Sequence, residues 1–465
     1  MATSIVNIHP DILDSMFKFS LPTSLPKPIS SHAEAATFFS STSPYNLALT
    51  CRNWREFALS SHSLWSSIFF SFDLPSSEDS IASRRALERH VKRSEKAPLT
   101  CFIKLSSWYK WSDVFGIISC LLECQKRWRR VGLYLGPREA ALESNISLMI
   151  EDLKLLKELH IHNEVQHYFY TTSADIRLPS LTHLKLEVRT SDGVLNWLRL
   201  APNLQELYFH NTPLMGGSQS DRTKSLAHPN PSGAIFLPAL RCLRTGVFIP
   251  NTTHDASSPS LAVNIFVNTT CHALTELQVN LHSIKCDEAL LSFLRRSAPP
   301  LRTLIIDVQN CILPLEPNVH RERVLVDAIT LVPSVRSISF EWNVDSYFPE
   351  VVFQALSQTN SVLPALEHLE LAFIDAPVEQ FLDVITARWR SERRTLKAVT
   401  LTGCIFQVPY PRIHLCRECI RFQQFNCGDN PSELPESLNA LREYISGGLD
   451  YRANYLRQNT TADLA

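Results

Sequence analysis

The chain has little glycine and almost no net charge. Only 12 of its 465 residues are glycine, and it contains no Walker loop, Gly-x-Ser-x-Gly elbow or His-Glu-x-x-His pair that would indicate an enzyme. A formal net charge of −1 removes the bulk electrostatic argument for binding nucleic acid or anionic membrane. No window approaches the ~18 consecutive apolar residues of a membrane span, and the first residues lack signal-peptide features. We therefore expect a cytosolic or nuclear protein.

A disulfide framework is not expected either. The 12 cysteines are scattered through apolar stretches, for example at Cys101, Cys120, Cys271 and Cys311. In a reducing compartment this distribution is typical of small core residues. We therefore predict free cysteines buried in the interior.

Metal-like and basic clusters are few. One knuckle-like group is formed by His414, Cys416, Cys419 and Cys427. Zinc sites usually pair two such knuckles, so we predict reduced cysteines and no metal there. His160 and His162 flank Ile161 and face one side of a predicted strand, which is typical of a polar surface. Basic runs at 127–130 and 388–394 contain Trp128 and Trp389. Each run lies at a predicted helix end, where cations are favourable, and we interpret both as solvated faces rather than nucleic-acid sites.

The N-terminal stretch contains two predicted helices with apolar stripes. In the first, Pro10 and Asp11 suit a helix start, and one stripe is made of Ile12, Leu13, Met16, Phe17 and Leu21. A Ser- and Pro-rich insertion covers 23–44. The second helix, over about 45–60, has a stripe of Leu47, Cys51, Trp54 and Ala58. These stripes form either a small core pinned by Trp54 and Trp65 or a docking surface for another protein.

The order of these residues resembles the F-box, especially the form common in mushroom-forming fungi. The resemblance rests on Ile8-His9-Pro10-Asp11-Ile12-Leu13…Phe17, Leu49-Thr50-Cys51-Arg52-Asn53-Trp54-Arg55-Glu56-Phe57-Ala58-Leu59 and Leu64-Trp65-Ser66-Ser67-Ile68. The chain departs from the family pattern in having Ile8-His9-Pro10 in place of Leu-Pro, and in the insertion. The resemblance implies a surface, or its immediate support, that docks on the Skp adaptor of a cullin-RING ubiquitin ligase: Pro10, Ile12, Leu13, Phe17, Leu49, Cys51, Trp54 and Trp65.

After a predicted linker at 73–80, one pattern recurs to about residue 410. Each segment has an apolar residue, two variable residues, and then apolar-x-apolar. Predicted strands of this kind cover 99–105, 131–135, 159–161, 181–186, 204–209, 240–243, 274–279, 301–306, 335–340, 366–371 and 396–401. Predicted helices lie between them, including 86–94, 114–126, 146–156 and segments before 204, 301, 335 and 396. Such units cannot bury their own apolar faces alone, which indicates stacking.

We therefore predict an α/β fold in which a small F-box (1–72) precedes an irregular leucine-rich-repeat-like solenoid (81–410). Helices lie outside and parallel strands inside, and 411–465 form a cap and tail. A doubly wound α/β domain is the structural rival, because it also alternates helix and strand, but it requires a glycine-rich phosphate loop. Hydrophilic stretches at 213–233 and 250–259 are predicted to be insertions in loops.

The functional hypothesis is a substrate-recognition subunit of a Skp-cullin-F-box ubiquitin ligase. It has no catalytic residues or cofactor, and it binds the adaptor, through it a cullin, and an unknown protein target. Candidate target contacts are His183, Lys185, Gln205, Tyr208, Glu276, Gln278, Glu367 and Glu370. Two alternatives remain open: a non-degradative scaffold that binds the adaptor without delivering clients, and an enzyme without a recognisable motif.

Overall fold

The chain forms two compact units, Met1–Thr212 and Pro213–Ala465. The computed structural model describes residues 9–20, 44–72, 77–105, 119–135, 153–163, 177–188, 194–211, 234–246, 261–281, 283–308, 319–342, 347–407 and 437–454. Several predicted features lie outside these ranges: the insertion at 23–44 apart from Pro44, the stretches 213–233 and 250–259, and the cluster around His414.

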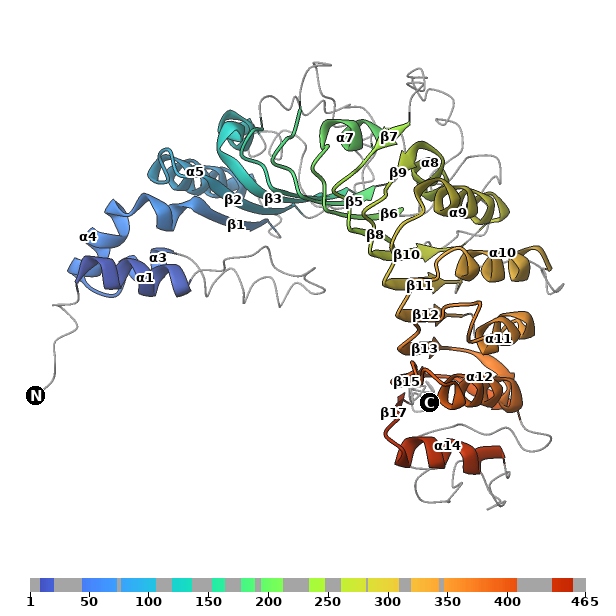
Figure 1. Cartoon of the computed structure of the whole chain (residues 1–465). Helices are drawn as coiled ribbons and strands as arrows, with labels where there is room; N and C mark the ends of the chain where they lie inside the picture. Colours follow the sequence, from blue (N-terminus) through green and yellow to red (C-terminus); the bar gives the residue numbers. More distant parts are fainter. Residues whose placement is uncertain are drawn as a thin grey trace, which may run out of the picture. The chain divides into compact units, whose positions relative to one another are not determined.

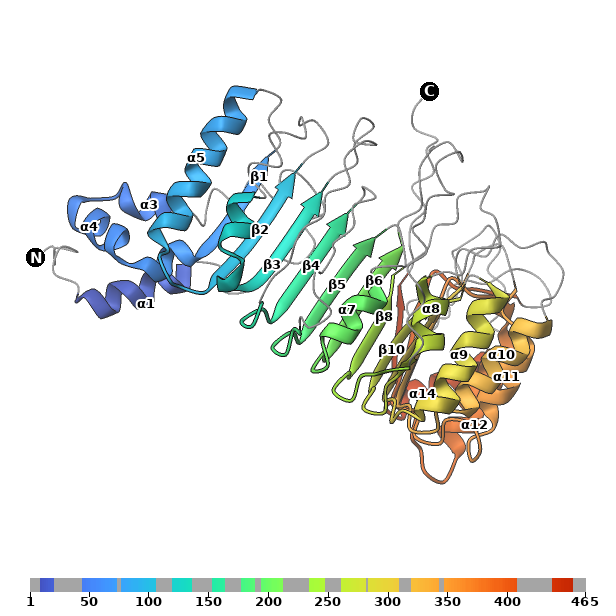
Figure 2. The ribbon, with the colours of Figure 1, turned by 90° about the horizontal axis from the view of Figure 1, so that it is seen from above.

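The first unit begins with helices and continues as a parallel sheet (Figure 2). Its helices are α1 (Pro10–Ser20), α3 (Pro44–Ala48), α4 (Arg52–Ser60), α5 (Ser77–Arg93) and α7 (Val194–Leu200), with short 3-10 turns η2 (His62–Ser66) and η3 (Gln125–Arg127). Its strands pair in the order β1 (Ser67–Phe72), β2 (Leu99–Leu105), β3 (Trp128–Leu135), β4 (Glu158–Asn163), β5 (His183–Val188) and β6 (Glu206–Asn211).

The second unit repeats helix and strand more regularly. Its main strands pair in parallel in the order β8 (Cys242–Thr245), β10 (Glu276–Asn280), β11 (Thr303–Asp307), β12 (Ser337–Glu341), β13 (His368–Ala372), β15 (Ala398–Thr402) and β17 (Asp450–Asn454). Two small parallel pairs join β7 (Ile235–Phe236) to β9 (Thr269–Thr270) and β14 (Asp375–Pro377) to β16 (Ile405–Gln407).

The helices of the second unit line one side of its strands (Figure 1). They are α8 (Leu261–Asn268), α9 (Ile284–Ser297), α10 (Val319–Thr330), α11 (Glu350–Ser357), α12 (Val378–Arg390) and α14 (Ser437–Ser446). Each packs beside the next along the chain. In α9, for example, the apolar stripe of Leu290, Phe293 and Leu294 is buried, as expected for a helix that covers a sheet.

The recurring apolar pattern explains the strands. Every predicted strand segment overlaps a strand, and those of the second unit begin two residues after the first apolar residue, as β15 begins at Ala398 after Leu396. That first residue is buried, for example Leu204 and Leu301, while the later apolar positions alternate inward along the strand. Within each unit the strand order follows the chain order, without the reversal that defines a doubly wound sheet.

Near several predicted boundaries the structure contains elements that the sequence pattern did not indicate. Helix α5 begins at Ser77, inside the predicted linker, because its first turn is hydrophilic but still helical. Strand β1 lies inside the stretch predicted to be a separate N-terminal domain. The described part of the helix predicted over 146–156 is a turn at Leu153–Leu156. Helix α14 and strand β17 form a further unit beyond residue 410, where only a cap and tail were predicted.

Candidate functional site

Helix α1 carries two apolar stripes that differ in exposure. Leu13 and Phe17, one turn apart, are buried, and the Phe17 ring packs edge-on against Trp54 with 4.9 Å between ring centroids. Ile12 and Met16, also one turn apart, are 55% and 47% exposed. Residues four apart lie on the same helix face, so the second stripe is a continuous apolar surface. Part of the apolar surface of α1 is therefore left exposed to solvent.

The second predicted helix is broken, contrary to the prediction of one helix over 45–60. Helix α3 ends at Ala48, and Cys51 adopts an extended conformation before α4 begins. The break is stabilised because Arg55 Nε donates to the Ala48 carbonyl at 3.0 Å, which satisfies an acceptor left over at the helix end. As a result Leu49 is 72% exposed and Cys51 is exposed rather than part of the stripe.

Trp65 was predicted to form part of the docking surface or its immediate support, and it has no exposed surface. Its Nε1 donates to the Ala58 carbonyl at 2.6 Å. Trp65 lies three residues before Ile68, and Trp128 lies three residues before Val131. Ile68 and Val131 are both in register with Cys101 of β2. Trp65 therefore occupies the leading apolar position of the first strand, and its role is in the core.

The core around Trp65 is small. It consists of Leu13, Phe17, Ala48, Ala58, Leu64 and Trp65, with Tyr45, Leu47, Trp54 and Phe57 packed against it. Trp54 is half-buried in this cluster. Pro10 is the first residue of α1, and its side chain lies outside what the structure describes. Of the eight residues that the resemblance singled out, Ile12, Leu49 and Cys51 have side chains described as exposed.

An aromatic and cationic cluster joins these helices to α5. The Trp65 ring meets the His90 ring at 5.0 Å and Tyr45 at 4.9 Å, and the Arg93 guanidinium lies 4.4 Å from the Trp65 ring centroid. His90 Nε2 is 3.2 Å from the Ser67 carbonyl of β1. Burial lowers the pKa of His90 to about 4; the Ser67 carbonyl opposes this shift and Arg93 adds to it. The histidine is therefore neutral near pH 7.

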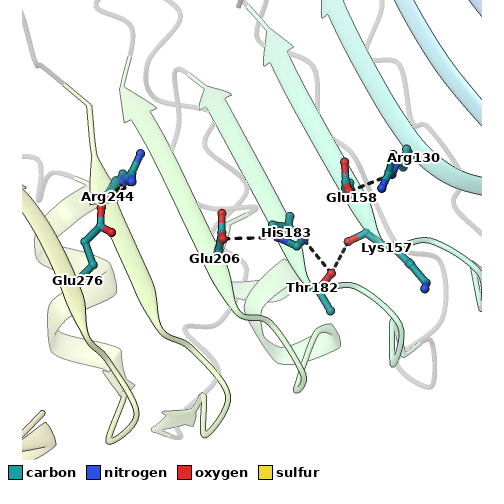
Figure 3. A network of polar contacts seen from close by, with 8 residues as sticks. All are labelled: Arg130, Lys157, Glu158, Thr182, His183, Glu206, Arg244 and Glu276. Atoms are coloured by element: carbon teal, nitrogen blue, oxygen red, sulfur yellow. Dashed lines mark hydrogen bonds and ion pairs between the residues drawn. The ribbon is translucent and has the colours of Figure 1, made fainter. Parts of the chain in front are cut away.

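On the sheet of the first unit, polar side chains of neighbouring strands pair across the register. Arg130 Nε lies 2.9 Å from Glu158, and His183 Nε2 lies 3.5 Å from Glu206 (Figure 3). Lys185 is in register with Tyr208, and its Nζ is 4.8 Å from the ring centroid. The structure thus brings together three of the predicted target contacts, His183, Lys185 and Tyr208. Glu206, which the sequence analysis missed, belongs to the same surface.

Gln205 and Glu367 are not on the strands, contrary to the prediction. Each lies one residue before its strand, with a buried leucine immediately ahead of it. The alternating outward positions of β6 are Glu206 and Tyr208, because Leu207 faces the core. The error arose because the repeated segment was taken as strand from its first residue.

In the second unit, Glu276 and Glu370 occupy outward positions of β10 and β13. Glu276 Oε1 lies 2.6 Å from Arg244 NH2 of the adjacent strand β8 (Figure 3). Gln278 is half-buried on the next outward position of β10. Burial raises the pKa of Glu341, and the neighbouring carboxylates of Asp307 and Glu370 raise it further. The carboxyl groups of Asp307, Glu341 and Glu370 therefore lie close enough to interact across β11, β12 and β13.

The structure describes some of the residues named in the cysteine and metal predictions. Cys101, Cys120 and Cys271 are free and buried, as predicted. Burial raises the thiol pKa of Cys120 to about 11 and of Cys271 to about 12, so neither thiol is activated as a nucleophile. Among the described residues no group of three or more His, Cys, Asp and Glu side chains is arranged to hold a metal ion.

The basic runs are not simple solvated faces. Trp128 and Trp389 are buried, so neither offers an exposed ring for stacking on a base. Arg388 is 1% exposed and donates to three backbone carbonyls, those of Leu356, Val362 and Leu363. It holds the end of α11 and the following turn in place, which is a structural role.

Comparisons with known proteins leave the family open. No protein-family model matches the chain, and no curated protein is found to be similar to it. No helix in the described ranges is both long and apolar enough to cross a membrane. The functional interpretation therefore rests on the residues and geometry given above.

Proposed function

We propose that the protein is an F-box substrate receptor: helices α1, α3 and α4 dock on a Skp-type adaptor, and the repeated strands hold a protein target. In this proposal the helix–strand units form a leucine-rich-repeat-like solenoid, because each strand pairs with its predecessor in the chain and each helix of the second unit packs beside its neighbour. The chain acts by proximity, and the residues that form the ubiquitin bond belong to other subunits.

The observation that carries the proposal is the exposed apolar surface on a very small helical core. Ile12, Met16 and Leu49 are all about half or more exposed although Leu13 and Phe17 are already buried beneath α1. Exposed apolar residues grouped on one helix face, together with an exposed leucine at the break between α3 and α4, indicate a protein-docking surface. The polar outward positions of the strands provide a separate surface for the target.

The proposal is tested by placing a charge in the exposed stripe. We expect Ile12→Asp to abolish co-purification of the full chain with a Skp-type adaptor, because an aspartate in an apolar contact loses its hydration without gaining a partner. Ser292→Asp, at an exposed position of α9, is the matched control and should bind normally. Leu13→Ala is a poorer probe, since Leu13 is buried and its truncation destabilises the core by about 2–5 kcal/mol.

Normal adaptor binding by the Ile12→Asp variant would contradict docking through α1. Mass spectrometry of proteins recovered with the tagged chain, with the proteasome inhibited, then tests the receptor role. Ubiquitylated clients are expected beside the adaptor and cullin. Recovery of adaptor and cullin without clients would instead support a non-degradative scaffold.

A further inference from the structure

The residues just before the strands of the second unit are stacked by a ladder of backbone hydrogen bonds. The Arg241 carbonyl accepts from the N–H groups of Thr275 and Glu276, and the Thr275 carbonyl accepts from Arg302 and Thr303. The same pattern continues from Arg302 to Arg336, then to Glu367 and Lys397. These six residues therefore lie side by side at intervals of about 4.8 Å, over roughly 24 Å.

Four of the six stacked residues are cations with exposed side chains. We call Arg241, Arg302, Arg336 and Lys397 the basic edge. The side chains of Arg336 and Lys397 are 60% and 64% exposed. Arg302 and Arg336 are immediate neighbours, and like charges on adjacent strands repel. This arrangement costs stability unless anions compensate it.

Compensation within the described residues is incomplete. Glu367 lies 2.8 Å from Lys397 Nζ and 3.4 Å from Arg336 NH1, so one carboxylate serves two cations. Arg241 and Arg302 form no ion pair with any residue that the structure describes. The basic edge therefore keeps a surplus of positive charge that a bound anion would neutralise.

Acidic residues also occur farther along the same strands. Asp307 and Glu341 are the last residues of β11 and β12, and Glu370 is an outward residue of β13. Asp307 is buried and Glu341 is half-buried, so they add little exposed negative charge to the sheet. The surplus positive charge at the strand starts therefore attracts a negatively charged ligand.

We propose that the basic edge binds an acidic segment of a protein partner, with carboxylates placed between Arg302 and Arg336. The inference rests on the proposed role of this sheet in target binding and names the chemistry of the target. Guanidinium groups form paired hydrogen bonds with carboxylates. The stacked residues include no aromatic side chain, so bases of a nucleic acid have no stacking platform there. An extended peptide of about eight residues spans the edge.

The test measures binding of a fluorescein-labelled peptide of about ten alternating Glu and Gly residues to the full chain by fluorescence anisotropy. We expect Arg302→Ala with Arg336→Ala to weaken binding by about tenfold, and added salt to weaken it in the wild type. Glu367→Gln should tighten binding by about threefold, because it removes the internal carboxylate that competes for Arg336 and Lys397. A loss of fold cannot produce such a gain.

The controls remove the same charge elsewhere. Lys285→Ala with Arg323→Ala, at exposed positions of α9 and α10, should leave binding within about twofold. The same is expected of Arg129→Ala with Lys157→Ala, at the start of β3 and just before β4 in the first unit. An equal loss in either control, no tightening by Glu367→Gln, or tighter binding of a single-stranded RNA of equal charge would overturn the proposal. Adaptor co-purification, measured on the same variants, should stay normal; its failure would count against the proposed function and not against the basic edge.

Discussion

At the scale of single residues, Arg388 shows that a buried cation organises the backbone around it. Its guanidinium donates through Nε, NH1 and NH2 to three carbonyls at 2.7–2.8 Å, all from the end of α11 and the turn that follows. Burial lowers the pKa of Arg388 to about 10, so the side chain remains charged at neutral pH. Helical spacing places Arg388 on the buried face of α12 with Phe381 and Ile385. The sequence does not show that its partners are carbonyls about 30 residues away in the chain.

Replacing Arg388 should therefore destabilise the second unit. We expect Arg388→Met to lower the free energy of unfolding by about 3 kcal/mol, because buried carbonyls lose their donors. Arg388→Lys should recover only part of this, since an ammonium group cannot reproduce the planar arrangement of donors. Urea unfolding followed by circular dichroism provides the measurement. Arg393→Met, at an exposed position of the same basic run, should change stability by less than about 0.5 kcal/mol; a similar effect of both substitutions would refute the role of the three bonds.

At the scale of elements, His90 connects α5 to α3, η2 and β1, and its burial favours the neutral form. The folded pKa of about 4 lies below the ordinary value of 6.5, so the unfolded chain binds the proton more readily. The stability that the neutral side chain contributes is fully present above pH 6.5 and is lost as the pH falls toward 4. The junction of these elements is therefore sensitive to acid.

This sensitivity predicts a specific pH dependence. Between pH 7 and pH 5, titration of His90 should reduce the free energy of unfolding by about 2 kcal/mol. His90→Gln should remove that part of the decrease, whereas His62→Gln, at an exposed histidine, should not. Unfolding midpoints in urea at the two pH values measure the difference. An identical acid loss in wild type and His90→Gln would show that other groups account for it.

The same scale shows what the sequence predicts and what it does not. The apolar pattern predicted every strand in which a buried leucine or valine precedes the central apolar residue by three positions. Burial of both residues imposes that spacing. Strand β17 was missed because the residue two positions before it is Gly448, with φ of 104°. The equivalent residue before β15 is Leu396. The break at Leu49–Cys51 was missed because it depends on Arg55 reaching the Ala48 carbonyl, a contact that periodicity does not encode.

The candidate surfaces were predictable to a similar degree. Composition and spacing identified Ile12 and Leu13 together, but only packing shows that Leu13 is core and Ile12 is surface. The same holds for Trp65, whose conspicuous position in the sequence reflects the leading place of a strand. The basic edge was not predicted, because its successive members are separated by 34 to 61 residues and come together only through the strand ladder.

At the scale of the whole molecule, each element depends mainly on its neighbours in the chain. In the second unit, α9 packs on α8 and α10, α11 on α10 and α12, and every main strand pairs with the ones before and after it. For such an array stability is a sum of local terms and interfaces between neighbours. A local defect should therefore open nearby units before distant ones.

Hydrogen exchange of the Arg388→Met variant tests this property. We expect peptides from β13, β15 and β17 to lose protection, because Arg388 lies at the end of α12 and fixes the end of α11. Peptides from β2 to β5 should exchange at wild-type rates, since they belong to the other compact unit. Mass spectrometry of peptic fragments resolves these regions. Equal loss of protection in all of them would mean that the chain unfolds as one cooperative body, and that the surface of α1 and the basic edge cannot be altered independently by mutation.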